Sequence, residues 1–289
     1  MVDVDSALGE LFGLEVCVIR NSKGFRRLLS SPILSASAAV HLGAAAAVLT
    51  YPRDWPWAIG AVAANHGVLA AAGLWPRSRL LGPNWIRLPA ASGARGEVAL
   101  TIDDGPDPAV TPQVLDLLAK RGAQATFFCV GERVERYADI AREIVQRGHA
   151  IENHSQRHRH NFSLLGPRGM RDEIVRAQDG ISRITGSTPR FFRAPAGLRN
   201  PFLEPVLESL ALRLASWTRR GFDTINGNAD VVYRRLARSL GGGDILLLHD
   251  GNAALGATGR PVILDVLPRL LDRMRAVRLS PVTLRTALQ

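Results

Sequence analysis

Hydrophobic and polar positions divide this chain into two parts with different patterns. Before residue 96, two uncharged, Ala-rich stretches at residues 33–50 and 57–75 are each close to the ~20 residues that a helix needs to cross a hydrocarbon core. From Glu97 onward, short apolar runs alternate with segments of helical spacing. The pattern therefore predicts a pair of apolar helices followed by an α/β domain.

The two apolar stretches are interpreted as a membrane hairpin. A short segment at residues 51–56 separates them, and its Pro residues break a helix while its aromatic residues suit the headgroup zone. Two buried helices of a soluble domain are the alternative, which the polar His41, Asn65 and His66 inside the stretches would suit. A cleaved signal peptide fits less well, because about 32 residues precede the first stretch and a second stretch follows it.

Basic residues flank this pair of stretches. They precede it at Arg20, Lys23, Arg26 and Arg27 and follow it at Arg77, Arg79 and Arg87, whereas the connecting loop has only Arg53 beside Asp54. By the positive-inside rule, both ends, and with them the domain, are expected on the cytoplasmic side of a bacterial-type inner membrane. The expected organisation is an N-terminal segment (1–32), a hairpin anchor (33–75), a linker (76–96) and a catalytic domain (97–289).

The second part alternates strands and helices. The predicted strands are residues 98–103, 125–130, 150–154, 190–193, 212–217, 245–249 and, more weakly, 282–284. The predicted helices are residues 112–121, 134–147, 170–185, 229–240 and 261–276. This order predicts a parallel sheet covered by helices, and about seven such units suit a distorted (β/α) barrel slightly smaller than the eight-stranded type.

Composition supports a folded protein and narrows its partners. Hydrophobic residues make up 46% of the chain and charged residues 21%, which excludes a disordered polymer. The net charge of +10 is spread as single Arg residues, so we expect an anionic surface such as phospholipid headgroups, or an anionic substrate, and no nucleic acid. Cys17 and Cys129 lie far apart, and no disulfide is expected.

Polar residues stand at the carboxyl ends of the predicted strands, namely Asp103, Asp104, His154, Arg193 and His249. In a parallel barrel all these ends open on one face, where the active sites of such barrels lie. The adjacent Asp103 and Asp104 cannot share a strand face, so if Asp104 points at a metal, Asp103 can lean toward a substrate. Asp-Asp-Gly-Pro is also good turn chemistry, which remains the alternative for this pair.

The spacing of two histidines indicates a metal site. His154 and His158, at i and i+4 on one helical turn, would lie on one face and chelate one ion. Together with Asp104 they form a set that suits Zn, and also Co, Fe or Mn. His249 ends a very apolar strand, which favours a neutral-pH acid or base over a core histidine bonded to Asp250.

Four ordered motifs then point to a known family. They are Thr101-Ile102-Asp103-Asp104-Gly105-Pro106, His154-Ser155-Gln156-Arg157-His158, Arg193-Ala194-Pro195-Ala196-Gly197 and Leu247-Leu248-His249. From residue 97 onward, about two thirds of the chain resembles the polysaccharide deacetylase family, carbohydrate esterase family 4. The resemblance implies a distorted (β/α) barrel and a metal-assisted deacetylation.

The resemblance also implies a role for each motif residue. Asp103 would be the general base, and Asp104, His154 and His158 would be the ligands of a divalent metal, Zn foremost, with Co or Mn as alternatives. His249 would be the general acid, Arg193 would hold Asp103, and the backbone N–H near Ala196 would help to bind the oxyanion.

The sequence departs from the family pattern in two places. Ala196 stands where members commonly carry an aromatic residue, so a wall for stacking a sugar is expected to be missing. The fourth motif appears only as Trp217-Thr218-Arg219-Arg220-Gly221-Phe222-Asp223. Asp223 is expected to pair with Arg193 or with His249, and Arg219 and Arg220 near the site mouth could meet a phosphate or carboxylate of the substrate.

The sequence therefore predicts a metal-dependent hydrolase that removes N-acetyl groups from a sugar in a glycan or a lipid-linked glycan precursor. The alternatives are removal of O-acetyl or formyl groups from a lipid-linked sugar, or an inactive membrane-anchored carbohydrate-binding module. The inactive module is disfavoured because all three ligands and both proton-transfer residues are present. The expected partners are an acetylated glycan or lipid-linked sugar and membrane lipid.

Overall fold

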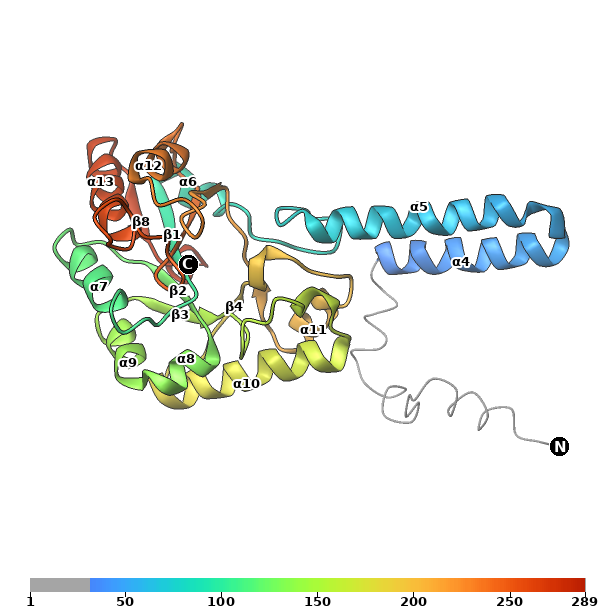
Figure 1. The fold of residues 1–289 in the computed structure, drawn as a ribbon, viewed down its shortest axis with the longest axis horizontal. Helices are drawn as coiled ribbons and strands as arrows, with labels where there is room; N and C mark the ends of the chain where they lie inside the picture. Colours follow the sequence, from blue (N-terminus) through green and yellow to red (C-terminus); the bar gives the residue numbers. More distant parts are fainter. Residues whose placement is uncertain (1–31, 289) are drawn as a thin grey trace.

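The computed structural model describes residues 32–288. Figure 1 shows an α/β domain and a helical hairpin that projects from one side of it. The hairpin consists of α4 (Pro32–Thr50) and α5 (Trp55–Leu74), joined by the 3-10 turn η1 (Pro52–Asp54). Proline stands in the first turn of both η1 and α5, where a missing N–H is tolerated. These prolines interrupt the chain between α4 and α5 and are also compatible with the start of α5.

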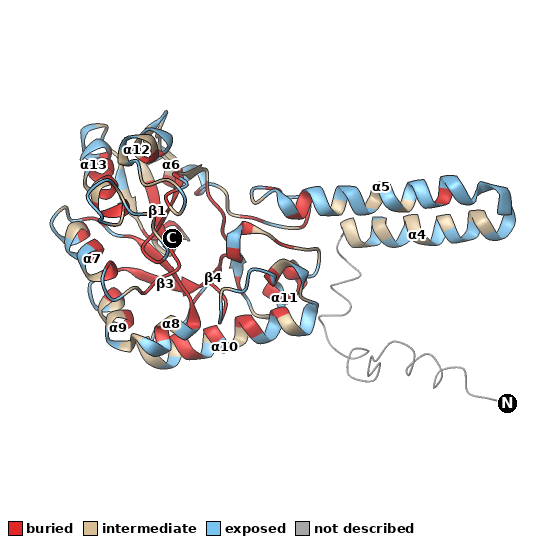
Figure 2. Cartoon of the chain, in the orientation of Figure 1, coloured by how far each residue is buried: buried red, intermediate tan, exposed pale blue. Residues whose placement is uncertain are grey.

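The hairpin helices are exposed along most of their length. Both are long and apolar enough to cross a membrane, with mean hydropathies of 1.7 and 1.4, yet only 6% and 17% of their apolar stretches are buried. Figure 2 shows this exposure on both helices, which is not what the alternative of two buried core helices would give. The polar side chains pair across the hairpin: His41 Nε2 lies 3.2 Å from His66 Nε2, and Asn65 donates to the Ser37 hydroxyl at 2.8 Å.

The domain is built on one parallel sheet with the strand order β5-β4-β3-β2-β1-β7-β6, and β8 pairs with β1 as well. The strands are β1 (Glu97–Asp103), β2 (Thr126–Cys129), β3 (Ala150–Asn153), β4 (Phe191–Phe192), β5 (Arg213–Leu214), β6 (Arg219–Arg220), β7 (Ile245–His249) and β8 (Ser280–Val282). Within residues 32–288, β5 and β6 end the sheet and do not pair with each other, so the sheet curls into an open, distorted barrel. This confirms the predicted fold class.

Helices cover the outside of the sheet (Figure 1). They are α6 (Ala90–Ala94), α7 (Thr111–Ala119), α8 (Gly131–Arg136), α9 (Ala138–Gln146), α10 (Pro167–Thr185), α11 (Leu203–Ser209), α12 (Ala229–Ala237) and α13 (Ile263–Ala276), with 3-10 turns η2 (Phe162–Leu164), η3 (Pro195–Gly197) and η4 (Thr286–Leu288). The helix predicted at residues 134–147 is two helices, because Tyr137 leaves the helical region at φ −121°, ψ 52°. The short α11 and β6 were not predicted.

Alternation along β1 places the first candidate residue inside the barrel. Successive strand residues point to opposite faces. Leu100 and Ile102 belong to the core beneath the outer helices, whereas Ala99 belongs to the cluster inside the barrel. Asp103 shares the parity of Ala99, so its carboxylate faces the interior at the strand's carboxyl end.

The same rule applies to two other strands. In β7, Leu247 lies in the inner cluster and Leu248 in the outer core, so His249 faces inward. In β4, Phe191 lies in the inner cluster, so the following Arg193 has inward parity. Residues far apart in sequence therefore meet at one end of the barrel.

Residues 76–96, which the sequence predicts to be a linker, lie against the domain. The N–H of Trp85 donates to Leu214 O, and the N–H of Ser216 donates to Trp85 O, both at 2.9 Å, so Trp85 continues the sheet beside β5. Arg87 pairs with the buried Asp244 at 2.7 Å. The segment that connects the hairpin to the barrel is thus packed onto the barrel's edge.

Candidate active site

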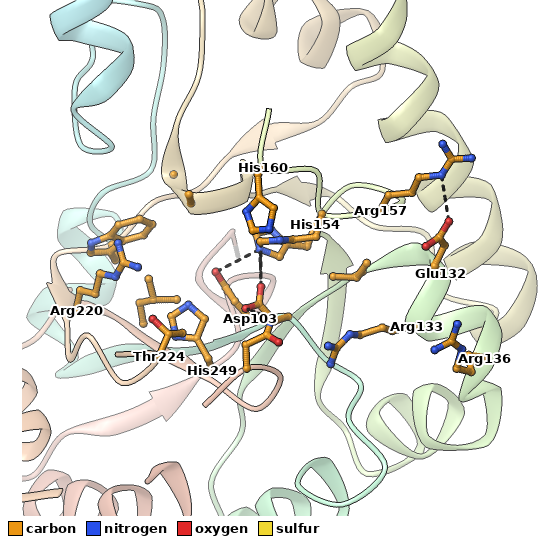
Figure 3. A pocket seen from close by; sticks show the side chains of 18 residues that line it. Asp103, Glu132, Arg133, Arg136, His154, Arg157, His160, Arg220, Thr224 and His249 are labelled. Carbon is orange, nitrogen blue, oxygen red and sulfur yellow. Dashed lines mark hydrogen bonds and ion pairs between the residues drawn. The ribbon is translucent and has the colours of Figure 1, made fainter. Parts of the chain in front are cut away.

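A cavity of about 560 Å³ opens at the carboxyl ends of the strands. Figure 3 shows that Asp103, His154 and His249 reach it from different elements. Asp104, His158 and Ala196 also line it, so the structure brings all the predicted ligands together with both predicted proton-transfer residues. Arg193 and Asp223 lie behind Asp103 and His249.

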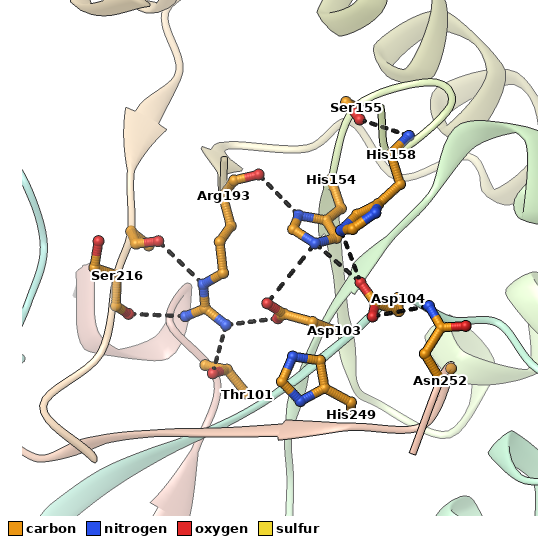
Figure 4. A network of polar contacts seen from close by, with 12 residues as sticks. Thr101, Asp103, Asp104, His154, Ser155, His158, Arg193, Ser216, His249 and Asn252 are labelled. Atoms are coloured by element: carbon orange, nitrogen blue, oxygen red, sulfur yellow. Dashed lines mark hydrogen bonds and ion pairs between the residues drawn. The ribbon is translucent and has the colours of Figure 1, made fainter. Parts of the chain in front are cut away.

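Three ligand atoms converge on one point beside β1. One ligand atom from each of Asp104, His154 and His158 lies within 4.8 Å of the others. The Nε2 atoms of His154 and His158 are each 3.2 Å from Asp104 Oδ1. In Figure 4, His154 Nδ1 points at the carbonyl oxygen of Arg193, 2.8 Å away. A neutral His154 therefore donates from Nδ1 and presents a lone pair at Nε2.

This arrangement fits a divalent metal ion. Nε2 atoms that present lone pairs to a carboxylate oxygen, as metal ligands do, repel it unless a cation lies between them. Asp104 Oδ1 is buried and makes no hydrogen bond within the described chain, whereas Asp104 Oδ2 accepts one from Asn252 at 3.2 Å. Metal–ligand distances of ~2.1 Å in a tetrahedral site place ligand atoms ~3.4 Å apart, close to the spacing seen here. Burial is the main cause that lowers the pKa of His158 to about 4, which keeps it neutral as a ligand must be.

The loop that carries the two histidines is irregular, so the predicted helical turn was wrong. Ser155 and His158 adopt left-handed backbone conformations at φ 65° and 49°. Side-chain bonds stabilise this path, because Ser155 N–H donates to Asn153 Oδ1 at 2.9 Å and His158 N–H donates to Ser155 Oγ at 3.0 Å. The rings of His154 and His158 still meet, with centroids 4.9 Å apart, for a reason other than helical spacing.

Arg193 fixes one oxygen of Asp103. Its guanidinium donates to Asp103 Oδ1 at 2.6 Å and to the Thr101 hydroxyl at 2.8 Å. Two backbone carbonyls and the Phe128 ring, 4.1 Å away, surround the rest of it. Burial lowers the pKa of Arg193, and the charge and hydrogen bond of Asp103 oppose that shift. Asp103 Oδ2 remains on the ligand side, 3.9 Å from His154 Nε2.

Asp223 holds His249 by two contacts. Its Oδ1 lies 2.9 Å from His249 Nδ1, and its Oδ2 accepts the backbone N–H of His249 at 2.7 Å. Burial lowers the pKa of His249, but the hydrogen bond and charge of Asp223, together with the charges of Asp103 and Asp104, outweigh burial and raise it overall. Of the two partners considered for Asp223, the structure therefore has His249. Asp250 does not bond His249; it accepts hydrogen bonds from Thr111 and Gly251 instead.

Two further wall residues come from the third and fourth motifs. Ala196 has a left-handed backbone at φ 55°, and its N–H has no acceptor within residues 32–288. Gly197 beside it has φ 74°, and an added Cβ would lie 2.6 Å from the Trp217 ring and 2.8 Å from Pro76. The loop therefore needs glycine there, and Trp217 packs against it as part of the cavity wall.

One residue of the site was not predicted from the sequence, and another was misplaced. Asn252, which bonds Asp104, lies three positions after His249, and only its place beyond a strand end could have indicated it. Arg219, expected near the site mouth, pairs with Asp244 at 2.6 Å and does not line the cavity, whereas Arg220 does.

The sequence and the fold have known relatives. The sequence profile of the polysaccharide deacetylase family matches residues 90–215. A chitooligosaccharide deacetylase of Bradyrhizobium sp. (strain ANU 289) is 34% identical over 161 residues, which are 55% of this chain and 73% of the relative. The chain belongs to the polysaccharide deacetylase family. This family membership confirms the resemblance found in the motifs.

Other members of the polysaccharide deacetylase family extend the match. A peptidoglycan-N-acetylglucosamine deacetylase of Bacillus cereus is 33% identical over 156 residues, 53% of this chain and 72% of the relative. The structure of a family 4 carbohydrate esterase from Streptomyces lividans, in complex with acetate, superposes with a TM-score of 0.59 at 31% identity. The superposition covers 66% of this chain and 95% of the esterase.

Proposed function

We propose that this polysaccharide deacetylase removes N-acetyl groups from a sugar by metal-dependent hydrolysis. The observation that carries the proposal is the meeting of Asp104, His154 and His158 with Asp103 and His249 around one cavity. The relatives named for N-acetylglucosamine and chitooligosaccharide deacetylation support an N-acetyl group as the target.

Asp104, His154 and His158 would hold the metal, Zn foremost, with Co or Mn as alternatives. When bound there, it would supply a Lewis acid for the acetyl carbonyl and for the attacking water. The chain itself orients these ligands: Arg193 O accepts from His154 Nδ1, and Asn252 donates to Asp104 Oδ2. Such outer contacts fix the direction of each ligand's lone pair.

Asp103 acts as the general base in this proposal. Arg193 binds its Oδ1, which leaves Oδ2 free to accept a proton from the attacking water as the C–O bond forms. Ala196 lines the cavity, and its N–H, which has no acceptor in the described chain, would donate to the oxyanion that develops on the acetyl carbonyl.

His249 acts as the general acid. Its raised pKa favours the protonated ring near neutral pH, and Nδ1 is engaged by Asp223, so the proton available to the substrate is on Nε2. That proton passes to the sugar nitrogen as the C–N bond breaks, which releases acetate and a free amine. Arg193 and Asp223 are positioning residues in this scheme.

The substrate is proposed to be a glycan or a lipid-linked glycan precursor. It would lie at the membrane in which the hairpin anchors the enzyme. The end of α5 adjoins the cavity wall, because Pro76 packs beside Gly197 and Arg77 donates to Thr218 O at 3.4 Å. Trp75, 60% exposed at that end, suits the headgroup zone. A sugar carried on a membrane lipid would therefore be presented close to the site.

Acetate release from a panel of sugars tests the function. The full-length protein in detergent would receive N-acetylated, O-acetylated and N-formylated sugars, each free, polymeric or lipid-linked. We expect acetate from N-acetylated substrates. Release only of formate, or only of ester-linked acetate, would favour the alternative bond, whereas sugar binding without any release would favour the inactive module.

Reporter fusions test the proposed location. The Lys and Arg bias around the hairpin predicts that both ends lie in the cytoplasm. A reporter that fluoresces only in the cytoplasm, fused after Gln289, is expected to be active. Activity of an externally active reporter alone would reverse the orientation and make an extracellular glycan the substrate.

A further inference from the structure

The two neighbouring arginines of β6 have different surroundings. Arg219 forms an ion pair with the buried Asp244, whereas Arg220 has no carboxylate partner within residues 32–288. The Nε of Arg220 is buried without a hydrogen bond, and the side chain lines the cavity. Figure 3 shows Arg220 and Thr224 on the same side of the cavity as His249.

Aromatic rings hold the Arg220 guanidinium in place of a carboxylate. Its central carbon lies 5.4 Å from the Trp217 ring and 5.0 Å from the Phe222 ring. Contacts with ring faces stabilise a cation and leave its in-plane N–H groups available to oxygen acceptors. Arg235 lies 5.1 Å from the same Phe222 ring but does not line the cavity.

Arg220 forms no ion pair with the carboxylates around the cavity in the described part of the chain. Burial, opposed by Asp103, lowers the pKa of Arg193, and the charge of Arg220 lowers it further. Glu132, an acid of the cavity wall, is paired with Arg157 at 3.1 Å. An anionic ligand beside Arg220 would remove an unfavourable interaction that exists in the free protein.

We propose that Arg220 and the hydroxyl of Thr224 bind an oxyanion, a phosphate or a carboxylate, on the sugar substrate. The inference rests on the proposed function, in which His249 protonates the sugar nitrogen and the sugar therefore occupies this side of the cavity. No hydrogen bond involves the Thr224 hydroxyl in the described part of the chain, so it can donate to the same group. Arg220 thus makes the enzyme selective for acidic acetamido sugars.

Binding of matched sugars to full-length Asp103→Asn, which lacks the proposed general base, tests the inference without turnover. Calorimetry would compare N-acetylglucosamine 1-phosphate and N-acetylmuramic acid with neutral N-acetylglucosamine. We expect at least one acidic sugar to bind about tenfold more tightly than the neutral one, because charge-assisted contacts to arginine are strong. The acidic sugar that gains most identifies the group as phosphate or carboxylate.

Two variants assign the preference to Arg220. Arg220→Gln is expected to remove most of the tenfold ratio, and Arg220→Lys to retain part of it, since lysine keeps the charge without the planar fork. Arg235 also contacts the Phe222 ring but does not line the cavity, so Arg235→Gln should retain the tenfold preference for the acidic sugar. Melting temperature and metal content identify a variant that fails to fold, and Arg220→Lys then decides alone.

The outcomes separate this inference from the proposed function. Equal binding of acidic and neutral sugars by Asp103→Asn, or a ratio unchanged when either Arg220 variant is added to it, overturns the inference. A ratio that disappears on metal removal and ignores Arg220 assigns the anion to the metal and also overturns it. Acetate release is measured separately: release without acidic preference contradicts only this inference, and acidic preference without release from any sugar contradicts only the proposed function.

Discussion

The side of the cavity that carries Asp104, His154 and His158 differs from the side that carries Asp103 and His249. On the first side, Asp104 and His158 have left-handed backbones at φ 73° and 49°, a conformation that costs energy in residues other than glycine. The buried Asp104 Oδ1 makes no hydrogen bond in the described chain. The polypeptide alone leaves this side incomplete.

The second side is complete without a ligand. Asp103 and His249 end regular strands, where parity alone aims them inward. Arg193 holds Asp103 at 2.6 Å and Asp223 holds His249 at 2.9 Å, so each proposed proton-transfer residue has a partner that can carry the opposite charge. In the proposed mechanism, the fold would therefore organise the acid and base in advance, whereas the loop with His154 and His158 would need a cation to offset its backbone strain.

The largest expected effect comes from removing a metal ligand, or the metal itself, from the side with Asp104, His154 and His158. His154→Ala, or chelation of the wild type, should reduce acetate release by about 10³-fold or more, because the Lewis acid and the activated water are lost together. Zn, Co or Mn should restore the chelated wild type and raise its melting temperature. Elemental analysis of the metal would accompany the kinetics.

His160→Ala is the matched control, because His160 lines the same cavity but lies outside the ligand set. It should keep its metal and lose less than about tenfold in rate, as expected for a residue without a role in the reaction. Undiminished activity of the fully metal-free wild type would contradict the metal-dependent mechanism.

The next largest effect distinguishes the role of Asp103 from that of the three metal ligands. Asp103→Asn should retain the metal, because the ligand atoms come from Asp104 and the two histidines, yet it should lose about 10²–10⁴-fold in kcat as a general base is removed. Kinetics and metal content measured on the same sample would establish both points. A variant with near wild-type kcat would show that Asp103 is not the base.

The two sides also differ in how far the sequence could predict them. Asp103, Arg193 and His249 follow apolar strands whose alternation is visible in the sequence, so their convergence could be predicted before the structure. The partner of Asp223 could not, because the choice between Arg193 and His249 depends on how β6 and the loop after it lie against β7.

The convergence of His154 and His158 was predicted for a wrong reason. The i and i+4 spacing of His154 and His158 suggested a helical turn, but side-chain bonds from Asn153 and Ser155 stabilise a left-handed path that no hydrophobic periodicity reveals. The sequence also did not predict the packing of Trp85 beside β5. This is a contact between segments far apart in the chain, and the local Pro- and Gly-rich composition indicates only a linker.

The smallest expected effect tests the second side through its pH dependence. The pKa of His249 is raised because Asp223, with the charges of Asp103 and Asp104, outweighs burial, so the acid form persists above the ordinary histidine pKa, and kcat/KM should fall only as pH rises through this raised value. In Asp223→Asn, a neutral side chain replaces the charge that contributes most to raising this pKa, so the alkaline limb should move down by about one unit, with a several-fold loss of rate at neutral pH. The stabilisation that this pair provides follows the same sign: it is present in full below the unfolded-state pKa of His249 and is lost as pH rises through the folded-state value. A pH profile of acetate release for both proteins, with metal content as the control, measures the shift. An alkaline limb that stays in place in Asp223→Asn would mean that a group other than His249 supplies the proton, and it would remove the contrast between a side completed by the chain and a side completed by a metal.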